Sequence, residues 1–293
     1  MNGKSPLFIF GGTGFVGRSL LAGLAGRGYA ITCLVRTVRG VETVQRLGAR
    51  PVIGDVLQPE TYSSAIRSGS IVIYLIHTMG FQRQAGDFED LDRRAARTML
   101  EVSRQAGVAL IIHLSGLFDS RENLSRHLAS RAEVAELIRR SGIPAIILRA
   151  SIIFGQGSAS YEILKAALAL PVVPLPPWRQ TRVQPIAIGD VIRSLIAAIE
   201  RPELAGRTLD IAGPEVFTYG ELLRRFAASL GLKRRFFNVP FGAHQLAALL
   251  LSRLSDIGVR ETYALLESLR NTSIVSGENA IVTVFGFQST PVF

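Results

Sequence analysis

The most constraining feature of this 293-residue chain is a glycine-rich segment directly after a short apolar run. Residues 7–17 read LFIFGGTGFVG, and a helical pattern of apolar residues follows at once. A buried strand, a glycine turn and a helix in that order form a phosphate site for a dinucleotide. Gly11 permits the tight turn, Gly14 lets a pyrophosphate approach the backbone, and Gly17 lets the helix pack on the strand. A glycine turn can also join a strand to a helix without binding anything, but the flanking patterns favour cofactor binding. The candidate cofactor contacts in this segment are Gly11, Thr13, Gly14, Phe15, Val16 and Gly17.

Composition indicates a soluble α/β protein rather than a membrane or nucleic-acid-binding one. Apolar residues make up 48% of the chain, yet no stretch approaches the roughly 18–20 uninterrupted apolar residues that a membrane span needs. The first residues lack the pattern of a secretory signal, so we expect a cytoplasmic protein. The single cysteine, Cys33, excludes an internal disulfide, and we expect no metal site. The net charge of +10 comes from scattered arginines without a nucleic-acid-binding motif, which favours an anionic cofactor or an acidic surface.

Apolar runs alternate with helical patterns along the first half of the chain. We expect strands at 7–10, 30–35, 51–53, 71–76, 109–114 and 145–148. The intervening helices are expected at about 14–27, 87–105 and 128–140, with Asp87 as the N-cap of the second. Continuous apolar strands between amphipathic helices predict a parallel sheet covered on both faces. The expected fold class is therefore α/β, a doubly wound parallel sheet with its ligand at the carboxyl ends of the strands.

The pattern changes after Gly155. Prolines at 171, 174, 176 and 177 interrupt an otherwise apolar stretch, which is typical of a loop that wraps a pocket. Shorter elements are expected at 182–188, 190–200, 208–212, 219–230 and 236–239. We therefore divide the chain into a dinucleotide-binding domain at 1–155 and a smaller C-terminal α+β lobe at 156–293, interleaved with the sheet. The apolar and aromatic segment 281–293 is expected to dock on the body of the protein or on a partner, including a second copy in an oligomer.

Four motifs give the chain a resemblance to the short-chain dehydrogenase/reductase superfamily. They are GGTGFVG at 11–17, GD at 54–55, HLSG at 113–116 and QPIAIGDV at 184–191. More narrowly, the chain resembles the atypical, NmrA-like branch of NAD(P)-binding proteins, often described as sugar epimerase/dehydratase-like. The resemblance covers most of 5–240 and implies a Rossmann fold with a nicotinamide cofactor.

The family's usual chemistry needs a serine, and a tyrosine and a lysine spaced Tyr-x-x-x-Lys on one helix. Ser115 occupies the serine position, and the pair's place reads HLASR at 127–131, so histidine replaces tyrosine and arginine replaces lysine. In one interpretation His127 and Arg131 form a modified acid–base pair, because they share a helix face and histidine exchanges a proton near neutral pH. In the other, which we favour, His127 is a surface histidine near a helix start and Arg131 has a structural or cofactor-contacting role.

The end of the second expected strand bears on the choice of cofactor. Arg36 stands where an NAD site would have an acidic residue for the ribose 2′-OH, whereas an arginine suits the 2′-phosphate of NADP. Arg39 is a second candidate for that contact, and the alternative is that Arg36 is an ordinary surface arginine. We therefore expect NADP(H) to be preferred, with NAD(H) as the other choice. The resemblance implies that Asp55 meets the adenine amino group, although a loop or helix-cap aspartate is the competing interpretation.

Further polar residues are expected near the reacting end of the cofactor. His77 follows the fourth strand, and the resemblance places its loop near the nicotinamide, so it is a candidate cofactor or substrate contact. It could also be a solvated loop histidine. Candidate substrate contacts in a cleft between the two lobes are His77, Arg149, Ser151, Trp178 and Gln184. Trp178 would stack on a substrate or pack within a lid. His113, inside an apolar strand, is expected in the core.

Two classes of function stay open from the sequence. The one that we favour is a cofactor-binding protein without turnover, either a sensor of the NADP/NADPH ratio or a scaffold subunit. The resemblance implies such roles through the regulatory NmrA proteins and the NADPH-binding accessory subunit of respiratory complex I. The alternative is an NADPH-dependent oxidoreductase of a small apolar carbonyl or quinone-like substrate, with Ser115 and His127 orienting or protonating the substrate oxygen.

Overall fold

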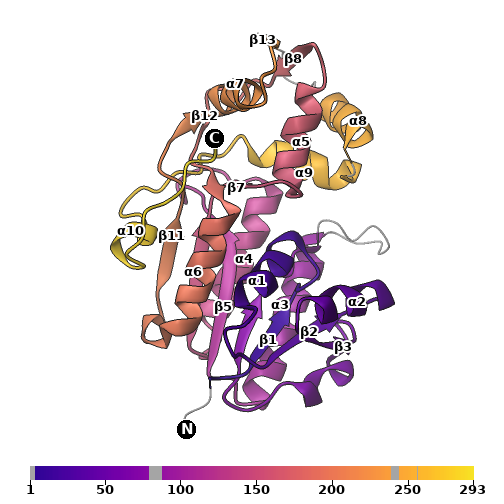
Figure 1. Ribbon diagram of the computed structural model, residues 1–293, viewed down its shortest axis with the longest axis vertical. Coiled ribbons are helices and arrows are strands. Elements are labelled where there is room, and N and C mark those ends of the chain that lie inside the picture. Colours follow the sequence, from indigo (N-terminus) through magenta and orange to yellow (C-terminus); the bar gives the residue numbers. More distant parts are fainter. Residues whose placement is uncertain (1–3, 79–87, 239–243, 256) are drawn as a thin grey trace.

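A seven-stranded parallel sheet forms the centre of the computed structural model, which describes residues 4–78, 88–238, 244–255 and 257–293 (Figure 1). Its strands are β1 (Leu7–Phe10), β2 (Ile31–Val35), β3 (Arg50–Ile53), β4 (Ile71–Tyr74), β5 (Leu110–Gly116), β6 (Ala145–Ala150) and β11 (Thr208–Ile211). Their order is β11-β6-β5-β4-β1-β2-β3, and every neighbouring pair is parallel. The order reverses between β1 and β4, and open α/β sheets bind ligands at such a switch point. The predicted doubly wound fold is confirmed.

Helices cover both faces of the sheet. They are α1 (Phe15–Leu24), α2 (Val38–Arg46), α3 (Phe88–Gln105), α4 (Arg126–Arg139) and α6 (Ile188–Glu200), with 3-10 turns at Pro59–Thr61, Ser63–Ala65 and Pro202–Leu204. Successive strand residues point to opposite faces. In β1, Leu7 and Ile9 therefore pack with α1 and α6, whereas Phe8 and Phe10 pack with α3 and α4. Because both faces of the inner strands β1 and β4 are buried, these two strands are continuous apolar runs.

The six strands expected in the first half of the chain are present, with small shifts at their ends. Helix α1 ends before the expected boundary because Gly26 and Gly28, each with a φ of 74°, adopt a left-handed conformation that ends a helix. Helix α4 begins earlier than expected because Ser125 caps it, accepting a hydrogen bond from the backbone N–H of Leu128. The expected cap Asp87 lies outside the described residues.

The C-terminal half of the chain contributes to two places. The strand expected at 208–212 within the smaller lobe is instead the seventh strand of the central sheet, paired with β6. The other elements gather around a separate apolar core above the sheet (Figure 1). They are β7 (Ile153–Phe154), α5 (Ala159–Leu168), β8 (Val172–Leu175), β9 (Arg182–Val183), β12 (Phe217–Thr218), α7 (Tyr219–Ser229), β13 (Arg235–Asn238), α8 (His244–Leu254) and α9 (Val259–Ser268). The short strand β10 (Ile186–Ala187) pairs with β7, and its Ile186 belongs to the core of the central sheet. The single element expected at 182–188 is thus divided into β9 and β10.

The apolar end of the chain packs on the protein's own body. After α10 (Ala280–Thr283), Arg193 of α6 lies 4.2 Å from the centre of the Phe287 ring, and the backbone N–H of Thr290 donates to buried Asp190. The ring of Phe293 lies 5.3 Å from that of Phe154, centre to centre. Of the two expected positions for this segment, docking on the body is the one observed. None of the helices in the described ranges is long and apolar enough to cross a bilayer.

Candidate functional site

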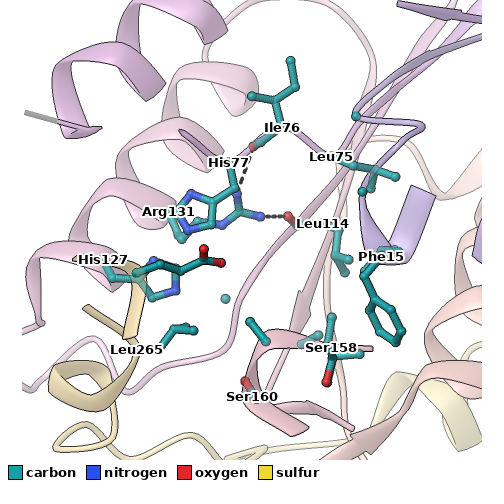
Figure 2. Close-up of a pocket in the computed structure, with 18 of the residues that line it drawn as sticks. Phe15, Leu75, Ile76, His77, Leu114, His127, Arg131, Ser158, Ser160 and Leu265 are labelled. Atoms are coloured by element: carbon teal, nitrogen blue, oxygen red, sulfur yellow. Dashed lines mark hydrogen bonds between the residues drawn. The ribbon is translucent and has the colours of Figure 1, made fainter. Parts of the chain in front are cut away.

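A cavity of about 740 Å³ lies where the parallel strands end and reaches under the C-terminal lobe (Figure 2). Its lining includes the segments that follow β1, β2, β4 and β5, together with residues of α4, α5 and α9. The segments after β1 and β4 flank the switch point of the sheet. Pockets that bind small molecules and cofactors typically measure about 300–1,000 Å³. This cavity is therefore the candidate site.

The glycine turn between β1 and α1 forms one side of the cavity. Gly11 has a φ of 88°, a conformation that residues with a Cβ rarely adopt. A Cβ on Gly17 would lie 2.2 Å from the Gly11 carbonyl oxygen, so α1 packs this closely only because Gly17 has no side chain. Gly14 at the N-cap offers no capping side chain, which leaves the first-turn N–H groups of α1 able to bind an anion. The turn thus fits the pyrophosphate of a dinucleotide, and Thr13, Phe15 and Val16 also line the cavity.

Arg36 and Asp55 line the same side of the cavity, directly after β2 and β3. The Arg36 side chain is exposed at the end of its strand, whereas Arg39 is not among the lining residues. Asp55 Oδ1 accepts a hydrogen bond from the Leu57 N–H at 2.9 Å. Asp55 therefore fixes its own turn and also lines the cavity, so the two interpretations of this residue are compatible.

A histidine–aspartate pair lies beyond β4. His77 Nδ1 is 3.3 Å from Oδ2 of Asp92, a residue of α3 that is 2% exposed. The Asp92 carboxylate also accepts hydrogen bonds from the Thr78 N–H at 2.9 Å and from Ser130 Oγ at 3.0 Å. Burial raises the pKa of Asp92, but the hydrogen bonds from His77 and Thr78 and the charge of Arg131 outweigh burial and lower that pKa to about 2. Asp92 is consequently ionised at neutral pH.

His127 packs against His77, with ring centres 4.7 Å apart and a tilted interplanar angle of 34°. The interpretation of His127 as a surface histidine is therefore wrong, because its ring lies against the β4 loop with Nδ1 buried. Burial lowers the pKa of both imidazoles, and the positive charge of Arg131 lowers it further, so both rings are neutral at pH 7. His77 Nε2 and His127 Nδ1 are buried, and neither has a hydrogen-bond partner within the described structure. A buried polar atom left unpaired costs about 1–3 kcal/mol, which a ligand at this cavity would recover.

Arg131 connects the ends of two strands. Its guanidinium donates to the carbonyl oxygens of Leu114 and of Ile76, the latter at 3.2 Å (Figure 2). Ser115 Oγ in turn donates to the Arg131 carbonyl oxygen at 3.1 Å. Both side chains line the cavity, and each is hydrogen-bonded to backbone oxygens of the protein itself. These contacts agree with the structural interpretation of Arg131.

Of the substrate candidates in the second half of the chain, only Ser151 is among the lining residues. Arg149 leaves the cavity because it pairs with Asp210 of the neighbouring strand, with Nε 2.6 Å from Oδ1. Gln184 is buried, and its amide bonds backbone groups on two neighbouring segments. Trp178 also lies outside the lining residues.

Two parts of the site escaped the sequence analysis. The first is Asp92, although it shares the buried face of α3 with Ala96 and Met99, and a charged residue on a buried helix face signals a polar cluster. The second is an apolar wall of the cavity, formed by side chains of α5 and α9. Its residues are Ile163, Leu164, Leu265, Leu266 and Leu269. No local pattern distinguishes these five side chains from ordinary core residues.

Comparison with known proteins places this geometry in a family. A family described as NAD(P)H-binding matches residues 11–173, more than half of the chain. The chain is 29% identical over 242 residues to NADH dehydrogenase (ubiquinone) 1 alpha subcomplex subunit 9, mitochondrial, of Mus musculus, covering 80% of this chain but only 62% of the mouse protein. It is 28% identical over 239 residues to ceramide reductase of Caulobacter vibrioides, covering 81% of this chain and 74% of that protein.

A solved structure extends the likeness to the whole fold. A nucleoside-diphosphate-sugar epimerase from Staphylococcus aureus superposes with a TM-score of 0.71 at 18% identity, over 98% of each chain. At that identity the likeness concerns the fold alone. These likenesses agree with the resemblance to the NmrA-like, epimerase/dehydratase-like branch of the short-chain dehydrogenase/reductase superfamily. The chain therefore belongs to the NAD(P)H-binding family.

Proposed function

We propose that this protein is an NADP(H)-dependent oxidoreductase that interconverts an apolar carbonyl compound and the corresponding alcohol. The observation that carries the proposal is the continuity of one cavity, lined by the glycine turn, by His77 and His127, and by the apolar wall of α5 and α9. A cofactor cradle, proton-exchanging side chains and an apolar surface for a substrate thus meet in one space. The nicotinamide supplies a hydride donor or acceptor when the cofactor is bound.

The position of Arg36 supports NADP(H) over NAD(H). A guanidinium binds a phosphate through short, charge-assisted hydrogen bonds, and Arg36 lines the cavity directly after β2, where the adenosine ribose of a dinucleotide lies in doubly wound folds. In this arrangement the glycine turn would hold the pyrophosphate and Asp55 the adenine.

The apolar wall supports a substrate with a hydrocarbon chain. The apolar side chains of Leu164, Leu265 and Leu269 line the cavity together with the polar side chains of His77 and His127. A substrate that matches both would have an apolar body and one oxygen function. The relative named ceramide reductase is a precedent in this family for a reductase whose substrate has apolar chains.

Cofactor binding without turnover is the second candidate, and it rests on a different observation. Ser115 and Arg131 already hydrogen-bond to backbone oxygens of the protein, so neither replaces the missing tyrosine and lysine. The mouse relative is named as a subunit of a larger complex, which agrees with a scaffold role.

An NADPH oxidation assay separates the two candidates. Purified protein is incubated with NADPH and with 2-decanone, decanal or decyl-benzoquinone, and the absorbance of NADPH is followed. We expect saturable oxidation with at least one of these compounds, and none in a folded Gly14→Val variant, whose side chain would block the phosphates. NADPH binding by calorimetry without oxidation of any compound would favour the scaffold or sensor. No NADPH binding at all would exclude both.

A further inference from the structure

The geometry points to His77 as the acid–base residue of this site, with Asp92 as the residue that positions it and fixes its tautomer. The inference rests on the proposed function, which it extends from a reaction class to a proton-handling group. It also moves the expected role from His127, which stands at the family's tyrosine position, to a histidine on the loop after β4. The shift follows from which of the two rings has a carboxylate partner.

The hydrogen bond to Asp92 determines where the proton on His77 lies. An ionised carboxylate only accepts hydrogen bonds, so His77 Nδ1, 3.3 Å from Asp92 Oδ2, must carry the hydrogen. Because the ring is neutral, its Nε2 then has a free lone pair. The Thr78 N–H and Ser130 Oγ donate to the same carboxylate and hold it in place.

The lone pair on Nε2 can accept a hydrogen bond from a bound ligand. His77 lines the cavity, and its Nε2 is buried and has no hydrogen-bond partner among the described residues. A hydroxyl group of a ligand would satisfy it, whereas a carbonyl oxygen would not, because both atoms are acceptors. Of the two partners in the proposed reaction, the alcohol is therefore the one that fits the neutral ring.

His127 lacks the features that would let it take this role. It has no carboxylate hydrogen-bond partner within the described ranges, whereas His77 has Asp92. Its ring lies against His77 at 4.7 Å between centres, so a proton on His127 would be repelled by one on His77. We assign His127 to holding the His77 ring in its plane.

The step balances as an alcohol oxidation. The hydroxyl proton of the substrate moves to His77 Nε2 while the C–H bond on the same carbon breaks, and its electron pair leaves as a hydride to NADP⁺. The products are a carbonyl compound, NADPH and a protonated His77, whose charge is stabilised by Asp92 and is then lost to solvent. In the direction of reduction, protonated His77 returns that proton to the oxygen.

The tautomer can be measured without turnover, by long-range ¹H–¹⁵N NMR of the histidine rings. The chain has only four histidines, so His77 is assigned from a His77→Gln variant. We expect protonation at Nδ1 in the wild type. In Asp92→Asn the amide oxygen still accepts the hydrogen bond from the Thr78 N–H, so the amide NH₂ group faces His77 Nδ1. Because Nδ1 then has to accept a hydrogen bond, the ring proton should move to Nε2. Nε2 protonation in the wild type, or no change in Asp92→Asn, would overturn the assignment.

Kinetics tests the catalytic part, using 2-decanol oxidation with NADP⁺ as the probe reaction. We expect kcat to fall roughly 10²-fold in His77→Gln and in Asp92→Asn, with the NADP⁺ dissociation constant within about twofold of the wild type. His127→Gln should lose less than about tenfold. Weaker NADP⁺ binding in His77→Gln would mean that Nε2 bonds a hydroxyl group of the cofactor. An unchanged kcat in that variant would mean that His77 transfers no proton. Either result would overturn the inference. Absence of wild-type turnover with the expected tautomer would refute the proposed function instead.

Discussion

The two sides of the cavity are built from different parts of the polypeptide. The cofactor side combines the backbone N–H groups of the glycine turn with the side chains of Arg36 and Asp55, all from short segments after β1, β2 and β3. On the reacting side, His77, His127 and Arg131 line the cavity, and Asp92 of α3 hydrogen-bonds His77. The glycine turn depends on backbone shape, whereas the reacting side depends on buried charge.

This difference predicts different vulnerabilities. Backbone N–H groups do not titrate, so the glycine turn keeps its character over a wide pH range and is disturbed mainly by added volume. Buried imidazoles and carboxylates, in contrast, depend on their protonation state and on each other's charges.

The largest effect should be a fall in the free energy of unfolding in acid, caused by protonation of the buried His113. His113 is fully buried, and its Nδ1–H donates to the Tyr74 carbonyl oxygen at 3.0 Å. Burial, followed by the charges of Arg131 and His77, lowers the pKa of His113 to about 3, although the Tyr74 hydrogen bond and Asp92 oppose this shift. Because the folded pKa lies below the unfolded value of about 6.5, the stabilisation is complete above pH 6.5 and is lost as the pH falls toward 3. The full loss is roughly 5 kcal/mol.

Urea denaturation between pH 7 and pH 4 measures this effect. His113→Asn keeps a donor for the Tyr74 carbonyl oxygen but does not titrate, so its free energy of unfolding should depend less on pH than that of the wild type. His77 and His127, whose pKa values are also lowered by burial, should leave a residual slope of the same sign. Identical pH dependence in the variant would show that His113 does not limit stability in acid.

The same contrast explains what the sequence could predict. The sheet, its helices and the glycine turn depend on local patterns, namely apolar runs and a glycine spacing, and these were predicted with small errors at element ends. The contact between Asp92 and His77 joins two segments whose proximity is a product of the fold, so no local pattern indicates it. Arg149 shows the converse. Its position near the end of β6 suggested a substrate contact, but its side chain pairs with Asp210 on the adjacent strand β11.

The second prediction concerns cofactor choice on the cofactor side. If Arg36 holds the 2′-phosphate, Arg36→Ala should lose about 1.5–3 kcal/mol of NADPH binding free energy, roughly tenfold or more in affinity, because a charged hydrogen bond is lost. NADH affinity should change little. Calorimetric titration of both cofactors measures the difference.

Arg39→Ala is the matched control, since Arg39 belongs to the neighbouring helix α2 but not to the cavity lining. It should bind NADPH as the wild type does. Equal affinity of the wild type for NADH and NADPH, or a larger loss in Arg39→Ala than in Arg36→Ala, would contradict the assignment of Arg36.

The smallest effect tests whether backbone shape alone makes the cofactor side. A Cβ at Gly17 would lie 2.2 Å from the Gly11 carbonyl oxygen and 2.7 Å from Gly12 Cα, so Gly17→Ala must displace the turn. Overpacking of this kind costs about 1–3 kcal/mol, partly offset by the better helix propensity of alanine. Gly189→Ala is the control, because Gly189 also lies in the first turn of a helix but has open space where its Cβ would be. We expect urea denaturation to show a net loss in Gly17→Ala and a gain in Gly189→Ala, with weaker NADPH binding only in the former. A gain in stability in both variants would mean that α1 does not need a glycine at this contact, and the turn would then owe its shape to Gly11 and Gly14.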